Sequence, residues 1–184
     1  MGIFTYQGFR VYYERRIMKL QIAKVLSAEE IEQLAQAANK IWNEYYIQII
    51  TKEQIDYMVN KFQSAEAITD QIENQGYEYY LLKPENVIAG YIGIKETPQD
   101  SLFLSKFYIL KENRGKGYAR EAMEFMTEFC KQKGIKRIWL TVNRNNENSI
   151  KVYEKFGFHV TKTQVSDIGN GYVMDDFIME KDIL

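Results

Sequence analysis

The spacing of hydrophobic residues divides the chain into a helical N-terminal part and a strand-rich part that begins after residue 76. Residues 20–26 alternate between apolar and polar positions, which is typical of a strand. Apolar residues then recur every three or four positions over residues 28–45 and predict an amphipathic helix. Ser27 and Glu30 have the spacing of a capping box, so we expect this helix to begin directly after Ser27.

Two more helix starts follow. Thr51 and Gln54 have the spacing of a second capping box, and apolar residues at helical spacing come after it. Ser64 begins a third segment of this kind, which we expect to end near Gly76 because glycine commonly terminates helices. The N-terminal part therefore predicts one strand followed by three helices.

The rest of the chain is a series of strands interrupted by two helices. Alternation predicts strands at residues 77–82, 87–95, 101–110, 137–142, 158–165 and 173–179, and helical spacing predicts helices at residues 117–133 and 147–156. The resulting order, β-α-α-α-β-β-β-α-β-α-β-β, predicts an α/β (α+β) fold in which helices cover a mixed sheet.

Length and composition are those of a single globular domain. The 184 residues are 46% hydrophobic and 27% charged, and two prolines argue against a disordered linker. Residues 1–17 carry several charges and lack an apolar core, so we expect an N-terminal extension rather than a signal peptide, with the domain at residues 18–184. We expect no membrane span, because the chain has no apolar run of about 18 residues.

Single cysteine and histidine residues limit the chemistry. Cys130 alone cannot form a disulfide within the chain, which favours a reducing, cytoplasmic location. With His159 as the one histidine, the usual metal-binding clusters are not available, and we expect no metal. Cys130 lies on the apolar stripe of its predicted helix and is expected to be a core residue rather than a nucleophile.

Charge is distributed unevenly although the net charge is −1. Residues 27–76 contain nine acidic and three basic side chains, whereas residues 106–162 contain thirteen basic and six acidic ones. This asymmetry indicates one surface for a cation and another for an anion, or simply two solvated helical faces.

A glycine-containing loop joins a predicted strand to a predicted helix at residues 107–120. Unpaired N–H groups at such a junction and the helix dipole attract an anion, and Gly115 and Gly117 let the ligand approach the backbone closely. The loop fits neither a P-loop nor a Rossmann fingerprint, since Arg120 occupies the position of the last glycine. A pyrophosphate is the ligand we expect; a tight strand–helix turn without a ligand is the alternative.

A second motif begins about 20 residues after the start of the helix predicted at residues 117–133. It favours the pyrophosphate site over a turn without a ligand. Asn146 with Ser149, and Tyr153 with Gly157 and Phe158, together with the 114–119 segment, resemble the two signature motifs of the GNAT N-acetyltransferases. The resemblance covers residues 18–184 and is strongest over residues 87–158. It implies a mostly antiparallel twisted sheet of about seven strands, in which a splayed parallel pair at residues 101–110 and 137–142 holds acetyl-CoA as the co-substrate.

The resemblance also implies roles for individual residues. Backbone groups of the strand would bind the pantetheine arm, the loop would hold the pyrophosphate, Asn146 would contact the pantetheine region, and Tyr153 would act as the general acid beside the sulfur. The implied acetyl-CoA site comprises Phe107, Tyr108, Ile109, Arg114, Gly115, Lys116, Gly117, Tyr118, Ala119, Arg120, Asn146 and Lys155.

The acceptor side is less well defined. Residues 42–46, 57–62 and 175–180 resemble bacterial polyamine (spermidine/spermine) N-acetyltransferases, which implies a small cationic amine. Several of those enzymes carry glutamates on the strand before the loop, where this chain has Phe103, Leu104 and Ser105. The general base is therefore open. The candidates are Glu44, Glu78, Glu96 and a water chain ending at Ser105.

We expect direct transfer within a ternary complex, because no nucleophile suited to a covalent intermediate is evident. The expected partner is a small-molecule amine, with a second copy of the chain as an open possibility and with neither nucleic acid nor a membrane. Three alternatives stay open: acetylation of a protein N-terminus or lysine, acetylation of an aminoglycoside, and a sensor that binds acyl-CoA without turnover.

Overall fold

A computed structural model describes residues 20–184, so the extension expected at residues 1–17 lies outside the described residues. The N-terminal part contains the predicted strand and three helices: β1 (Leu20–Lys24), α1 (Ala28–Tyr45), the short 3₁₀ helix η1 (Tyr46–Gln48), α2 (Lys52–Gln63) and α3 (Ala65–Glu73). Ser27 and Glu30 form the complete capping box. The second box forms only in part, because Thr51 caps α2 while the side-chain amide of Gln54 lies against Met174.

The strand-rich part follows the predicted order. Its elements are β2 (Tyr77–Pro84), β3 (Gly90–Thr97), β4 (Ser101–Ile109), the 3₁₀ helix η2 (Lys111–Asn113), α4 (Tyr118–Lys133), β5 (Arg137–Asn143), α5 (Glu147–Lys155), β6 (His159–Gly169) and β7 (Tyr172–Asp182). β3 begins at Gly90 rather than at Val87, because Glu85 and Asn86 adopt the left-handed conformation of a turn. β6 and β7 extend further than predicted, since β6 is a largely exposed edge strand without a regular hydrophobic alternation.

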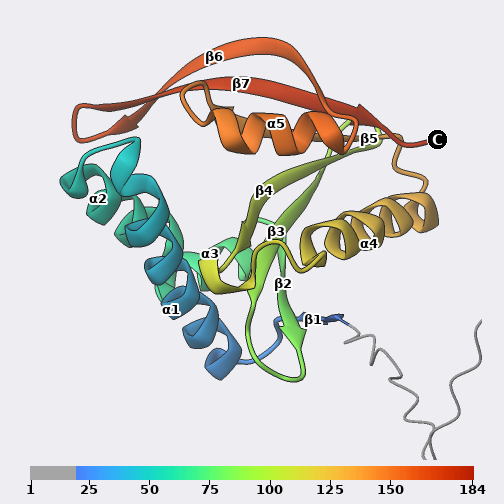
Figure 1. Ribbon diagram of the computed structural model, residues 1–184, viewed down its shortest axis with the longest axis horizontal. Coiled ribbons are helices and arrows are strands. Elements are labelled where there is room, and N and C mark those ends of the chain that lie inside the picture. The colour runs from blue at the N-terminus through green and yellow to red at the C-terminus, as the bar shows by residue number, and fades with distance from the viewer. Residues whose placement is uncertain (1–19) are drawn as a thin grey trace, which may run out of the picture.

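Within residues 20–184, seven strands form one sheet in the order β1-β2-β3-β4-β5-β7-β6, and only the β4–β5 pair is parallel. Helices α1 and α2 lie on one side of the sheet in Figure 1, and α4 lies on the other. Residues of α1 and α3 pack with the sheet around Tyr79 and Tyr91, and residues of α4 pack around Ile92 and Leu140. Within residues 20–184, no helix is both long enough and apolar enough to cross a membrane.

The parallel strands β4 and β5 separate soon after they begin. Their register pairs only three residues of each strand, Ser101 to Phe103 with Arg137 to Trp139. A β-bulge between β3 and β4 leaves Ser105 as the extra residue, two positions beyond the last residue paired with β5, and bulges bend the strand that carries them. The predicted splayed pair is therefore confirmed, and the backbone edges of β4 and β5 that face each other are open beyond Phe103.

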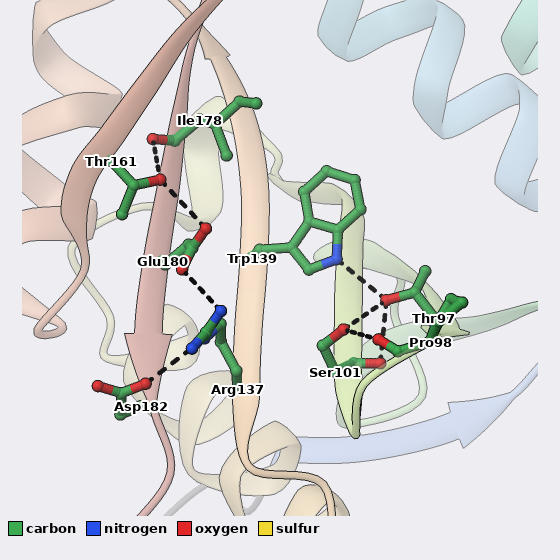
Figure 2. A network of polar contacts seen from close by, with 9 residues as sticks. All are labelled: Thr97, Pro98, Ser101, Arg137, Trp139, Thr161, Ile178, Glu180 and Asp182. Carbon is green, nitrogen blue, oxygen red and sulfur yellow. Dashed lines mark hydrogen bonds and ion pairs between the residues drawn. The ribbon is translucent and has the colours of Figure 1, made fainter.

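Side chains hold the two strands together at their paired end. The Trp139 indole N–H donates to Thr97 Oγ1 at 3.1 Å, and Thr97 Oγ1 also lies 2.9 Å from Ser101 Oγ (Figure 2). The ring of Trp139 stacks on Phe103 with centroids 4.1 Å apart. These contacts link β5 to the hairpin that precedes β4, so the separation is confined to the other end of the strands.

A second set of contacts secures β5 to its other neighbour. Arg137 forms salt bridges to Glu180 at 3.2 Å and to Asp182 at 3.6 Å, both on β7 (Figure 2). Glu180 also accepts a hydrogen bond from Thr161 of β6 at 3.1 Å. Side-chain contacts therefore connect β5, β7 and β6 at the end of the sheet where β5 is also paired with β4.

Gly90 permits a close approach between β3 and the open part of β4. A Cβ atom at this position would lie 2.2 Å from the carbonyl oxygen of Tyr108 and 3.1 Å from Cα of Ile109. Both obstacles are backbone atoms, which move only if the strand moves.

We expect Gly90→Ala to lower the free energy of unfolding by about 2–3 kcal/mol, because the added methyl group overpacks a rigid strand pair. Gly134→Ala is the matched control. Gly134 also has a special conformation, at φ +69°, but its Cβ would meet no atom within 4 Å, so this change costs only about 1 kcal/mol of backbone strain. Urea unfolding measures both values, and equal losses would contradict the close approach.

Candidate active site

A cavity of about 810 Å³ lies where β4 and β5 separate, and we refer to it as the central cavity. One part is lined by the end of β4, the loop before α4, and α5. The other part is lined by α1, η1, α2 and β7, on the opposite side of the sheet. The separation of the strands thus joins two regions that a continuous sheet would keep apart.

Most residues of the expected acetyl-CoA site line this cavity. These are Phe107, Tyr108, Ile109, Arg114, Gly115, Gly117, Tyr118, Ala119, Arg120 and Asn146. Tyr153, which was expected to be the general acid, lines it as well. Two expected residues do not. The Lys116 ammonium group donates to Asn113 Oδ1 at 3.0 Å, and Lys155 lines a neighbouring hollow of about 370 Å³ together with Arg120.

The loop at residues 114–120 has the geometry of an anion site. Gly115 and Gly117 have φ values of +76° and +91°, and a Cβ at either position would meet no atom within 4 Å. Within residues 20–184, the backbone N–H groups of residues 115–119 donate to no protein acceptor. Free N–H groups at the start of a 16-residue helix favour negative charge, so the loop fits a phosphate group.

Arg114 and Tyr45 close one side of this loop. Arg114 Nε donates to the carbonyl oxygen of Ile109 at 3.0 Å, and its guanidinium group lies 5.0 Å from the ring centre of Tyr45. Tyr45 in turn donates through its hydroxyl to Asn146 Oδ1 at 2.7 Å. α1 and α5 are therefore connected across the cavity by side chains that sequence analysis had assigned to different functions.

Asn146 is the N-cap of α5. Its Oδ1 accepts from the Ser149 N–H at 3.2 Å as well as from Tyr45, and the side chain is buried. Its Nδ2 donates to none of the described residues and is free for a group bound in the cavity. The asparagine thus orients the start of α5 in addition to lining the site.

The end of α5 fixes the position of Tyr153. Gly157 has φ +88°, as expected for a left-handed helix stop, and the N–H groups of Gly157 and Phe158 donate to the carbonyl oxygens of Glu154 and Tyr153. The Phe158 ring packs edge-on against Tyr153 with centroids 5.7 Å apart. Burial raises the pKa of Tyr153 well above its ordinary value, so its phenol is protonated at neutral pH.

None of the three glutamates suggested as a base lines the central cavity. Glu78 pairs with Lys24 at 2.9 Å and accepts from the Tyr80 hydroxyl at 2.6 Å. Burial raises the pKa of Glu78, but these two partners outweigh it and the pKa is lowered. Glu96 pairs with Lys133 of α4. Both glutamates lie toward the end of the sheet where β4 and β5 are still paired.

Glu44 is also outside the cavity, on the exposed face of α1. More generally, none of the nine acidic residues between positions 27 and 76 lines it. They occupy the solvated faces of their helices or the helix ends. The negative charge of this segment therefore lies on the outer surface and not within the site.

Sequence analysis missed two ionisable residues of the cavity, Asp176 on β7 and Lys106 on β4. Asp176 is 9% exposed, and burial, with a smaller effect from Asp175, raises its pKa to about 6. Burial lowers the pKa of Lys106 to about 8, and its ammonium group donates to Ser105 Oγ at 2.7 Å. A signal was present for Asp176, since by strand alternation it shares a face with the apolar Met174 and Ile178.

Aromatic side chains surround the acceptor part of the cavity. Trp42 and Tyr46 stack with centroids 4.3 Å apart, and the hydroxyl of Tyr46 lies 3.3 Å from that of Tyr108. Trp42 Nε1 and Gln63 Nε2 are buried and have no hydrogen-bond partner among the described residues. This part of the site therefore combines apolar walls with a few buried polar atoms that lack partners among the described residues.

Comparisons with known proteins agree with this geometry. The chain is 33% identical over 99 residues to the uncharacterized N-acetyltransferase YycN of Bacillus subtilis, an alignment that covers 52% of this chain and 64% of that protein. It is 28% identical over 101 residues to a putative [ribosomal protein bS18]-alanine N-acetyltransferase of the same organism, with 53% and 66% covered. The chain thus matches less than two thirds of the length of these curated relatives.

A solved structure matches over a greater length. PaiA N-acetyltransferase from Thermoplasma acidophilum, in complex with coenzyme A, superposes with a TM-score of 0.73 at 26% identity, covering 90% of this chain and 99% of that one. The family model of the acetyltransferase (GNAT) family matches residues 34–158, which include the loop, the split strands and Tyr153. The chain belongs to the acetyltransferase (GNAT) family.

Proposed function

We propose that this protein transfers an acetyl group from acetyl-CoA to the primary amine of a small cationic molecule. The observation that carries the proposal is the central cavity, which connects an anion-binding loop and Tyr153 with an aromatic recess that contains the buried carboxyl group of Asp176. Such a cavity can hold a phosphate-bearing donor and an amine at the same time.

The donor would occupy the part between β4, the 114–120 loop and α5. When bound, acetyl-CoA supplies an activated thioester. The free N–H groups of the loop would hold its pyrophosphate, and the open edge of β4 at residues 107–109 would bind the pantetheine arm in strand fashion. The neighbouring hollow, with Arg120, Lys131, Lys155 and Lys181, offers positive charge for a further phosphate. Bound coenzyme A in the similar PaiA structure supports this assignment.

Direct attack by the amine suits the residues that line the cavity. Cys130 is fully buried in the core, does not line the cavity, and has a pKa raised to about 12 by burial. A thiol in this state is a poor nucleophile. In the proposed reaction, backbone N–H groups on the open edge of β4 polarise the acetyl carbonyl, and the protonated Tyr153 gives its proton to the departing sulfur.

A polyamine is the acceptor we propose. Among the described residues that line the cavity, Asp176 is the one acidic side chain, so it can neutralise one ammonium group there. The acidic outer faces of α1–α3 would attract the remaining ammonium groups of a polyamine at longer range. The N-terminal amine of a protein is the second candidate, because one relative is named as a putative bS18-alanine N-acetyltransferase.

Release of free CoA across a panel of amines tests the proposed function. We expect spermidine to be acetylated faster than neutral amines and faster than peptides that present an N-terminal alanine. Its KM should rise with salt, because exposed acidic side chains are screened over about 8 Å at physiological ionic strength. Faster turnover of the peptides would favour the second candidate, and the absence of release with every amine would favour a non-catalytic sensor.

Tyr153→Phe tests the proposed acid. The change removes only the hydroxyl group, so the packing against Phe158 should survive and acetyl-CoA should bind as before. Positioned acid catalysis contributes about 10²–10⁴-fold, and we expect kcat to fall by about that factor. Rapid-quench measurement of the chemical step gives the value; wild-type speed would mean that water protonates the sulfur.

Gly117→Val tests the anion loop. A β-branched residue strains the left-handed backbone at φ +91° and projects into the open space over the free N–H groups. We expect acetyl-CoA affinity, measured by calorimetry, to fall about tenfold or more. Gly134→Val is the matched control, since it places the same residue in a similar left-handed position at the other end of α4. Equal acetyl-CoA affinity in the two variants would show that the loop does not bind acetyl-CoA.

A further inference from the structure

Asp176 is a buried carboxyl group without a partner among residues 20–184. It lies on β7 opposite Asn143 of β5 and Gln164 of β6, and it is 9% exposed. Its Oδ1 is inaccessible to solvent and forms no hydrogen bond with a described residue. An unpaired buried carboxylate is costly, so a side chain of this kind is expected to meet its partner in a bound ligand.

The surroundings of Asp176 suit a cation. It lines the same cavity as the aromatic faces of Trp42, Tyr46 and Tyr108, and such faces attract alkylammonium groups. Tyr46 and the proposed acid Tyr153 line the same cavity as Asp176. An ammonium group at Asp176 would therefore be bound in the cavity that contains the proposed acid.

We propose that Asp176 receives the ammonium group of the acceptor and takes its first proton, as the catalytic base of the acetyl transfer proposed above. The amine nitrogen then forms the N–C bond to the acetyl carbon as the C–S bond breaks. Tyr153 gives its proton to the sulfur and is restored by the second proton of the amine. Asp176 finally releases its proton to solvent, so one proton is released for each acetyl group transferred.

Burial sets the pH range in which Asp176 acts, with a smaller effect from its neighbour Asp175 on β7. The other titratable groups that line the cavity nearby are Tyr46 of η1 and Lys106 of β4. With a pKa of about 6, Asp176 is ionised at pH 7 yet more basic than an exposed carboxylate. Lys106 is the rival base. Its pKa of about 8 leaves it mostly protonated at pH 7, and its ammonium group is already bound to Ser105.

Asp176→Asn removes the charge with little change in shape, and Asp175→Asn is the matched control. Asp175 is half exposed and pairs with Arg144 at 3.3 Å, on the opposite face of the same strand. We expect kcat/KM for the best amine of the panel to fall about 10²–10⁴-fold in Asp176→Asn. The control should change it less than about threefold, as expected for an exposed pair.

The pH profile separates Asp176 from Lys106. In the wild-type protein we expect activity to decline below about pH 6. This acidic limb of the pH profile should be absent from the residual activity of Asp176→Asn. In Lys106→Met the limb near pH 6 should persist. A limb near pH 8 that disappears in Lys106→Met would assign the base to Lys106 and overturn the proposal.

Two readouts do not need acetyl-CoA. Calorimetric binding of spermidine to the protein alone should weaken at least tenfold in Asp176→Asn and not in Asp175→Asn.

The folded-state pKa of Asp176 lies above its unfolded value of 3.8, so the ionised form destabilises the fold above about pH 6. Asp176→Asn should accordingly raise the Tm at pH 8 and raise it less, or not at all, at pH 4. A lower Tm at both pH values, with amine binding unchanged, would identify a structural role and overturn the proposal.

The experiments distinguish a wrong role for Asp176 from a wrong overall activity. If the wild-type protein acetylates amines and Asp176→Asn does so equally fast, the inference is wrong and the proposed function stands. If no amine is acetylated, the proposed function is wrong, and spermidine binding that is lost in Asp176→Asn alone still supports an ammonium site. If Asp176→Asn loses neither activity nor spermidine binding, Asp176 is neither the ammonium site nor the base.

Discussion

The separation of β4 from β5 is the constraint on which the rest of the site depends. Three paired residues and the contacts around Trp139 hold the strands together at one end, and a bulge at Ser105 begins the divergence. Beyond that point each strand keeps a ladder on its outer side, with β3 or β7, and leaves its inner edge open. Open backbone groups need partners, so this gap is suited to a ligand that binds as a strand would.

The gap also connects the two faces of the sheet. α4, α5 and the glycine loop supply N–H groups and basic side chains on one side, whereas α1, α2 and β7 supply aromatic rings and Asp176 on the other. A donor with phosphates and an acceptor with an ammonium group would therefore approach each other from regions of opposite electrostatic character. The two halves meet at Tyr153, whose position the helix stop at Gly157 and the ring of Phe158 determine.

Stability and function compete at this cavity. Within residues 20–184, the buried side-chain atoms that lack hydrogen-bond partners belong to Trp42, Gln63 and Asp176, and all three residues line the same cavity. Unsatisfied buried groups each cost about 1–3 kcal/mol. The apolar clusters on both faces of the sheet must offset that cost, and such a concentration of unpaired atoms is typical of a binding site.

Local signals in the sequence predicted the fold and the donor half of the site. Capping residues set the start of each early helix, alternation located the strands, and Gly115, Gly117 and Gly157 occur where the backbone adopts left-handed conformations that other residues avoid. These features act over a few residues, so the sequence contains them directly. The family resemblance that the two motifs carry then implied the splayed parallel pair.

The acceptor half depended on contacts between residues far apart in the chain. Glu44, Glu78 and Glu96 were reasonable candidates by residue type, but the register of the sheet and ion pairs with Lys24 and Lys133 keep two of them away from the gap, and Glu44 faces solvent. Asp176 becomes significant only because α1 and α2 cover the face of β7 that carries it. By itself, the sequence determined the elements, the loop and the family resemblance. Which carboxyl group is buried beside the split strands was decided by packing across the sheet, because burial and desolvation are properties of the assembled tertiary structure.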